Sequence, residues 1–187
     1  MNPDQPTTVL IVPGLRDHVP EHWQTHLQAT LQHARTVPPL ERDRLSCAAR
    51  VDALNDELTA IDGPVILVAH SAGVMMVVHW AQHHYRAIKG ALLAAPADLE
   101  LPLPQGYPRV EELQANGWLP IPRSPLPFPS IVAASSNDPL ARLDRVAEMA
   151  ADWNGTLLKL GNVGHLNPAS GFGPWGAASV LIDRLDN

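Results

Sequence analysis

Short apolar runs alternate along the chain with segments of helical periodicity, and this alternation limits the possible folds more than any other feature. The runs occupy residues 8–12, 64–70, 90–95, 130–135 and 156–160. Between them, apolar residues recur every three or four positions, as they do on one face of a helix. Such an order predicts the α/β class, with a mainly parallel central sheet and helices on both faces.

Weaker signals add further elements. A short strand is expected near 35–37, where Pro38 and Pro39 limit its length. Later helices are expected at about 72–85, 139–152 and 175–185, and a short one around 109–116. The length of 187 residues fits one domain, 1–187, with little room for a separate cap domain.

Ser71 lies where the apolar run 64–70 meets a helical pattern. The sequence Ala69-His70-Ser71-Ala72-Gly73 matches the G-x-S-x-G nucleophile elbow, with Ala69 in place of the first glycine. Small residues are needed at both ends because strand and helix cross closely at this strained turn. An alternative is that Ser71 only caps the helix. The strand, turn and helix around it favour a nucleophile.

Two more candidates follow later apolar runs. Asp138 comes just after 130–135, and His165 comes just after 156–160. The order Ser71, Asp138, His165 is that of α/β-hydrolases, in which the histidine acts as base and the acid orients it. Asp138-Pro139 could instead be a turn or helix cap, and Asp98 competes for the role of acid. His165 could be an ordinary loop histidine.

A site for acyl transfer also needs N–H donors that stabilise an oxyanion. The amide of Ala72, next to the nucleophile, is one candidate. The second should come from the loop at 13–16, where Leu15 is the better candidate and Arg16 the next. Pro13-Gly14 could also be merely a turn.

The segment 96–129 holds nine of the nineteen prolines and lies between two predicted strands. We interpret it as a stiff rim or short lid over the site, although it could be a plain surface excursion. Its aromatic residues Trp118 and Phe128, completed by Phe172 and Trp175 and joined by Arg16, are expected to bind substrate. A small pocket of this kind favours short acyl chains.

Charge and composition exclude several classes of partner. The formal net charge is −6, and Lys89 and Lys159 are the only lysines, so nucleic acid and anionic membranes are not expected to bind. The single cysteine, Cys47, cannot form an internal disulfide and suits a reducing compartment. The run 9–12 is too short for a signal peptide, so we expect a cytoplasmic protein.

No cofactor or metal is expected. His22 and His26 share a helical face, but neither an HExxH motif nor a third ligand accompanies them, and we interpret them as helix-surface histidines. The glycines do not form the G-x-G-x-x-G pattern of nucleotide binding.

Several short motifs together resemble one known family. They are VPGL at 12–15, PEHWQ at 20–24, VAHSAG at 68–73, AAPAD at 94–98, PFPS at 127–130, ASSNDP at 134–139, GHLN at 164–167 and SGFGPW at 170–175. In these the chain resembles the retinoblastoma-binding protein 9/YdeN-type family of small serine α/β-hydrolases. The resemblance implies a reduced α/β-hydrolase fold and the triad Ser71, Asp138 and His165.

Two departures from that family pattern matter. The stretch 45–49 lacks the glutamate of a Leu-x-Cys-x-Glu element, so binding of the retinoblastoma protein is not expected. The region 38–50 also lacks the tryptophan expected in bacterial members.

The leading hypothesis from sequence is a serine hydrolase, a carboxylesterase that cleaves small esters through an acyl-enzyme. A thioesterase or a peptidase for small amides is the alternative among enzymes. A non-catalytic protein-interaction module on a hydrolase scaffold is the alternative from another class, since fold does not fix function.

Overall fold

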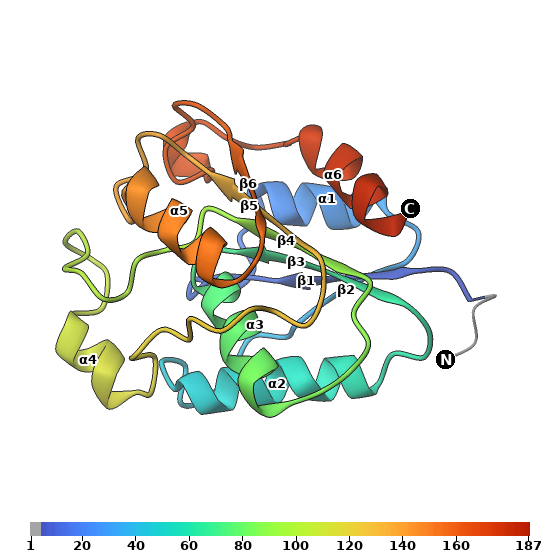
Figure 1. Cartoon of the computed structure of the whole chain (residues 1–187), viewed down its shortest axis with the longest axis horizontal. Coiled ribbons are helices and arrows are strands. Elements are labelled where there is room, and N and C mark those ends of the chain that lie inside the picture. The colour runs from blue at the N-terminus through green and yellow to red at the C-terminus, as the bar shows by residue number, and fades with distance from the viewer. Residues whose placement is uncertain (1–4) are drawn as a thin grey trace.

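The structure, a computed structural model, describes residues 5–187 and is built around one parallel sheet (Figure 1). Its strands are β1 (Thr8–Val12), β2 (Ala34–Thr36), β3 (Val65–His70), β4 (Gly90–Ala94), β5 (Ser130–Ala134) and β6 (Thr156–Lys159). They lie in the order β2-β1-β3-β4-β5-β6, and every neighbouring pair is parallel. All strands therefore end at the same edge, where open α/β sheets place their ligand sites.

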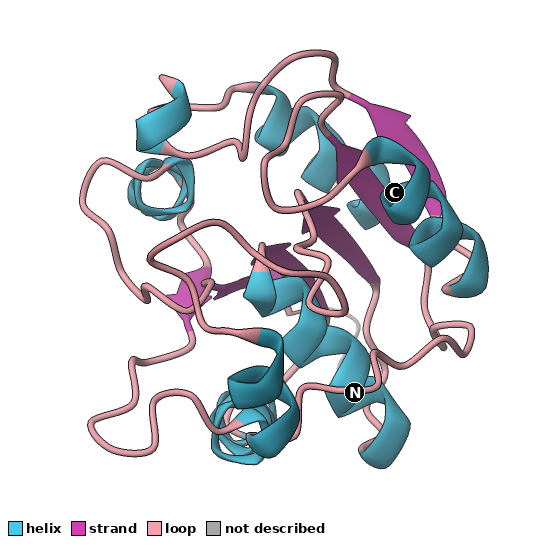
Figure 2. Ribbon diagram, turned by 90° about the vertical axis from the view of Figure 1, so that its left-hand side faces the viewer, coloured by secondary structure: helices cyan, strands magenta, loops and turns pink. Residues whose placement is uncertain are grey.

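Helices cover both faces of this sheet. They are α1 (Trp23–Thr30), α2 (Cys47–Thr59), α3 (Ala72–His83), α4 (Val110–Ala115), α5 (Leu143–Asp152) and α6 (Ala177–Asp186), with a 3₁₀ turn, η1 (Pro168–Ser170). Buried residues of α1 and α6 pack on one face, and those of α2, α3 and α5 pack on the other. Figure 2, seen from the side that carries α4, shows the two helical layers with the sheet between them. The predicted α/β-hydrolase fold class is confirmed.

Strand β1 shows why both faces are covered. Side chains alternate across a strand, so Leu10 and Val12 join the core under α2 and α3, whereas Val9 and Ile11 join the core under α1 and α6. A strand that carries apolar side chains on both of its faces has to be buried on both sides. The same holds for β3, all six residues of which are buried.

Several predicted element boundaries shift by one or two residues in the structure, and one shifts by four. The short strand near 35–37 is present one residue earlier, as β2. The helix expected from residue 139 begins only at Leu143. The reason lies in the preceding turn, where the Leu140 amide donates to Asp138 Oδ1 at 2.8 Å and the Leu140 carbonyl accepts from the Asp98 amide at 3.0 Å.

The segment 96–129 divides into two parts. Residues 97–108 run along the edge at which the strands end, and several of them line the cavity described below. The rest, from α4 onward, places Leu113, Trp118, Ile121, Leu126 and Phe128 in the core. Only the first part of the segment thus borders the cavity.

No helix within residues 5–187 combines the length and the apolar character that crossing a membrane requires.

Candidate active site

The turn between β3 and α3 holds Ser71 in a backbone conformation that residues other than glycine rarely adopt. Its φ and ψ are 58° and −126°, and such strain is typical of functional turns. Gly73 permits the turn because a Cβ at this position would collide with the carbonyl oxygens of Val12 and Pro13. Ala69, which replaces the first glycine of the motif, is fully buried. The hydroxyl of Ser71 is therefore presented at the end of the sheet.

Three side chains from three strand ends form a chain of hydrogen bonds. His165 Nε2 lies 2.9 Å from Ser71 Oγ, and His165 Nδ1 lies 2.8 Å from Asp138 Oδ2. A carboxylate only accepts, so Nδ1 carries the proton and Nε2 is free to accept from the serine hydroxyl. His165 and Asp138 expose only 5% and 3% of their side chains, so water does not compete for these bonds. The arrangement can pass a proton from the hydroxyl to the imidazole.

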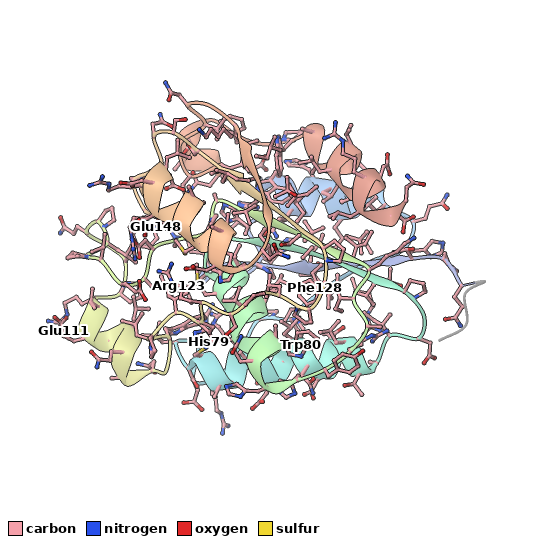
Figure 3. The ribbon with its side chains drawn as sticks, viewed as in Figure 1. His79, Trp80, Glu111, Arg123, Phe128 and Glu148 are labelled. Carbon is pink, nitrogen blue, oxygen red and sulfur yellow. The ribbon has the colours of Figure 1, made fainter. Side chains whose placement is uncertain are left out.

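Asp98, the competing acid, has other partners. Its carboxylate is buried and accepts from Arg145 Nε at 2.9 Å and from the Glu100 amide at 3.2 Å. Arg123 and Glu148, both labelled in Figure 3, extend this ion-pair network: Arg123 pairs with Glu100, and Glu148, on α5, pairs with Arg145. Asp98 is thus part of a structural network beside the site.

The loops that carry the acid and the histidine are tied to each other. Asn137 Oδ1 accepts from the Gly164 amide at 2.7 Å, and Ser170 Oγ accepts from the His165 amide at 3.0 Å. Gly164 has φ 56°, and a Cβ there would collide with the Ser170 side chain. Sequence reasoning missed Asn137 and Ser170 as supports. The polar cluster ahead of Asp138 was the available signal for Asn137.

Two further histidines lie next to His165. The ring of His70 is 4.8 Å from that of His165, and the ring of His22 is 4.6 Å from that of His70. His70 Nε2 donates to the His165 carbonyl at 2.9 Å and so links the turn that carries Ser71 to the loop that carries His165. Burial, followed by the charges of His165 and His22, lowers the pKa of His70 well below its ordinary value. Both neighbours are therefore neutral near pH 7.

His22 differs from its expected place on a helix surface. It is only 8% exposed and caps α1, with Nδ1 accepting from the Gln24 amide at 3.2 Å. Burial, followed by the charges of His165 and His26, lowers the pKa of His22 to about 4. Its position as the cap accounts for its burial, because a residue at the start of a helix can turn inward.

A cavity of about 490 Å³ opens beside Ser71. Its wall includes Leu15, Arg16 and Ala72 together with Ser71 and His165. Other members are mostly apolar, among them Ala97, Leu99, Leu103, Tyr107 and Leu140. Within residues 5–187, neither the Leu15 amide nor the Ala72 amide donates to another backbone or side-chain group. Both predicted oxyanion donors thus lie on the cavity with unused N–H groups.

A family model described as serine hydrolase matches residues 9–184, almost the whole chain. The chain belongs to the serine hydrolase family. No curated protein sequence matches this serine hydrolase.

Solved structures of other hydrolases share the fold of this chain. A YdeN-like hydrolase from Pectobacterium atrosepticum is 32% identical over 96% of this serine hydrolase and 90% of its own chain, with a TM-score of 0.80. The ydeN gene product of Bacillus subtilis is 17% identical, covers 96% and 98%, and has a TM-score of 0.73. Est1E from Butyrivibrio proteoclasticus, bound to ferulic acid, is 12% identical over 100% and 92%, with a TM-score of 0.71. The resemblance inferred from the sequence motifs is confirmed.

Trp118 and Phe128, expected to bind substrate, are not part of the cavity wall. Trp118 is fully buried, and its Nε1–H donates to the Leu45 carbonyl at 2.7 Å. Phe128 is 6% exposed and lies in the core just ahead of β5; it is labelled in Figure 3. A hydrogen bond from the Leu126 amide to the Trp153 carbonyl holds this part of the segment against α5. The two aromatic rings therefore fill the core and do not contact substrate.

Phe172 and Trp175 also lie outside the cavity wall. Both pack against the core under α1 and α6, and the ring of Trp175 meets that of Trp23 edge-on at 4.9 Å. They follow η1 in the chain, and Pro168 and Ala169 of η1 are the last residues of the chain that line the cavity. Of the five residues expected to bind substrate, Arg16 is the one that lines the cavity; Tyr107, an aromatic residue outside that group, lies there as well.

Over residues 5–187 no group of three or more His, Cys, Asp or Glu side chains is placed to hold a metal ion. The histidines around His165 have other roles, since His22 and His70 each use a ring nitrogen in a bond to the backbone.

Proposed function

We propose that this serine hydrolase is a carboxylesterase that cleaves small esters through an acyl-enzyme on Ser71. The observation that carries the proposal is the buried chain of hydrogen bonds from Ser71 through His165 to Asp138, with distances of 2.9 and 2.8 Å. A serine hydroxyl is a poor nucleophile until a neighbouring base takes its proton. His165 is in position to be that base, and Asp138 to fix its tautomer.

In the proposed reaction Ser71 Oγ attacks the ester carbonyl carbon while its proton moves to His165 Nε2. The carbonyl oxygen becomes an oxyanion that accepts from the amides of Ala72 and Leu15, two residues of the cavity wall. The tetrahedral intermediate collapses, and the alcohol leaves with the proton from His165. A water molecule then attacks the carbonyl carbon of the acyl-enzyme while His165 takes its proton. The second tetrahedral intermediate collapses, Ser71 regains its proton from His165, and the carboxylic acid is released.

The test is labelling with a fluorophosphonate and mass spectrometry of the modified peptide. Ser71 should be the serine modified, and Ser71→Ala should abolish labelling and lower turnover of 4-nitrophenyl acetate on the order of 10³-fold or more. Ser136→Ala is the matched control, since Ser136 is exposed and lies two residues before Asp138; it should label normally. Labelling of another serine, with Ser71 unmodified, would favour a non-catalytic interaction module.

The class of acyl compound is tested separately. A thioester and an anilide with the same acyl group should turn over more slowly than the ester at equal leaving-group reactivity. Preference for either of them would replace the carboxylesterase proposal with a thioesterase or a small-amide peptidase, and would leave the role of Ser71 intact.

A further inference from the structure

The charged residues on the cavity wall are unusual for an acidic protein. The chain carries a formal charge of −6, yet the charged side chains that line the cavity are two arginines, Arg16 and Arg44, and one acid, Asp17. The sign of charge that lines a cleft selects the charge of its ligand, because the low-dielectric walls focus the field. The excess of positive charge on the cavity wall favours an anionic ligand.

Both carboxylate oxygens of Asp17 are already bound by arginines. Its two carboxylate oxygens accept from Arg44 Nη2 at 2.8 Å and from Arg50 Nη1 at 2.9 Å. Arg50, only 3% exposed, also donates to the carbonyls of Arg44 and Leu15 at 2.6 and 3.3 Å. One carboxylate is therefore shared by two guanidinium groups, and it cannot also neutralise Arg16. Arg50 meanwhile holds the loop that carries Leu15 and Arg16.

Of the two arginines on the cavity wall, Arg16 is the one without an acidic partner. Among the ion pairs of residues 5–187 none includes it, and its side chain is exposed at the cavity. Its guanidinium carbon lies 5.4 Å from the ring centroid of Tyr107, another residue of the wall. Stacking on an aromatic ring uses the face of the guanidinium and leaves the N–H groups on its edge available. Those N–H groups match the two oxygens of a carboxylate.

We infer that Arg16 binds an anionic group of the substrate, so that the preferred substrates are small esters that carry a carboxylate. The inference rests on the proposed function, because it places this anion in the same cavity as the acyl group on Ser71. Arg16 directly follows Leu15, a proposed oxyanion donor, and an anion that binds its side chain would hold the ester near the donors. Glu41 and Asp43, in the loop of Arg44, do not line the cavity.

Two pairs of esters isolate the effect of a carboxylate on kcat/KM, because each pair consists of an anionic ester and a neutral partner. The first compares 4-acetoxybenzoate with its methyl ester, which places the charge on the alcohol side. The second compares mono-4-nitrophenyl adipate with 4-nitrophenyl hexanoate, which places the charge on the acyl side. Each kcat/KM is divided by the rate constant for hydroxide-catalysed hydrolysis of the same ester, which removes differences in intrinsic reactivity.

The wild-type protein should prefer the anionic member of at least one pair by about fivefold to tenfold, the scale of one charge-assisted contact at a partly open site. The pair that shows the preference identifies the side of the ester that carries the charge. The preference should decrease when the ionic strength rises from about 0.05 to 0.5 M, because salt screens an exposed charge.

Three variants test the assignment to Arg16. Arg16→Gln should abolish the preference, because kcat/KM for the anionic ester falls toward that of its neutral partner, and Arg16→Lys should retain part of it, since lysine keeps the charge without the planar fork. Arg184→Gln is the matched control, because it removes the same charge from an exposed position on α6, outside the cavity wall. It should keep the full preference.

The outcomes separate the two proposals. If Ser71 is labelled and neutral esters are cleaved, but neither anionic ester is preferred, the inference about Arg16 is overturned and the esterase proposal stands. A preference that survives Arg16→Gln and disappears in Arg44→Gln would also overturn the assignment to Arg16. If no ester is cleaved and Ser71 is not labelled, the proposed function itself fails.

Discussion

The loops after β3, β5 and β6 and the segment 96–129 both border the cavity, but they are held in different ways. The loops carry Ser71, Asp138 and His165, and hydrogen bonds from side chains such as Asn137 and Ser170 fix them. The second part of 96–129 is held by apolar side chains that pack into the core, such as Trp118 and Phe128. Changes in the first region should therefore affect the reaction, and changes in this part of the second should affect stability.

The largest contrast is expected between two aspartates, Asp138 in the loop after β5 and Asp98 at the start of the segment 96–129. Asp138→Asn should lower kcat on the order of 10⁴-fold with little loss of stability, because an amide favours the wrong tautomer of His165. Asp98→Asn should leave kcat/KM within about threefold but destabilise the protein by about 2–4 kcal/mol, because Arg145 loses a buried partner. Steady-state kinetics and urea unfolding of both variants measure the contrast.

A loss of activity without a loss of stability in Asp98→Asn, together with a mild effect in Asp138→Asn, would transfer the role of acid to Asp98. The distinction between loops that affect the reaction and a segment that affects stability would then be wrong.

The next contrast lies within the segment 96–129. Trp118→Ala should destabilise the protein by about 3–5 kcal/mol, because it removes a fully buried side chain and the bond to the Leu45 carbonyl. Tyr107 is a half-buried residue of the cavity wall. Tyr107→Ala should therefore lower stability far less and instead raise KM several-fold. Thermal unfolding and steady-state kinetics separate these effects.

Trp118→Phe covers the case in which the alanine variant fails to fold. It should retain kcat and KM within about twofold while still lowering stability. A changed preference among acyl chains in this variant would restore Trp118 as part of the substrate pocket.

A smaller effect is expected from His22, which lies beneath the site. The pKa of its folded state is lowered from 6.5 to about 4, so below pH 6.5 the unfolded chain binds a proton that the folded chain does not. The stabilisation is therefore complete above pH 6.5 and is lost as the pH falls from 6.5 to 4. His22 alone should cost about 2 kcal/mol between pH 7 and pH 5.

His22→Asn is the informative variant, because asparagine can still cap α1 but does not titrate. Its Tm should fall less than the wild-type Tm between pH 7 and pH 5, and the difference should be about 4–8 °C for a protein of this size. Equal decreases in the two proteins would assign the acid sensitivity to other groups, of which His70 is the nearest.

How far the sequence predicts this site depends on what each residue needs. A serine at a strand-to-helix turn, and polar residues in the loops that follow predicted strands, lie at the edge where parallel strands end, so Ser71, Asp138 and His165 could be placed together. Trp118 and Phe128 carry no such signal. A large aromatic side chain suits a pocket and a core equally, and its place depends on long-range packing that no local pattern encodes. The same applies to His22, whose burial follows from the fold around it.

The smallest effect concerns the length of the acyl chain. The apolar part of the cavity wall includes Ala97, Leu99, Leu103 and Leu140, whereas Arg16 belongs to the charged part. Each methylene group that contacts the apolar wall contributes about 0.8 kcal/mol, or roughly fourfold in kcat/KM, and the gain ends where the chain reaches charged groups or water. Among 4-nitrophenyl esters, acetate to butyrate should therefore exceed octanoate and palmitate. Leu103→Ala should reduce kcat/KM for butyrate more than for acetate, which locates the wall. A steady rise to palmitate would show a lipid channel and replace the small-ester proposal with a lipase.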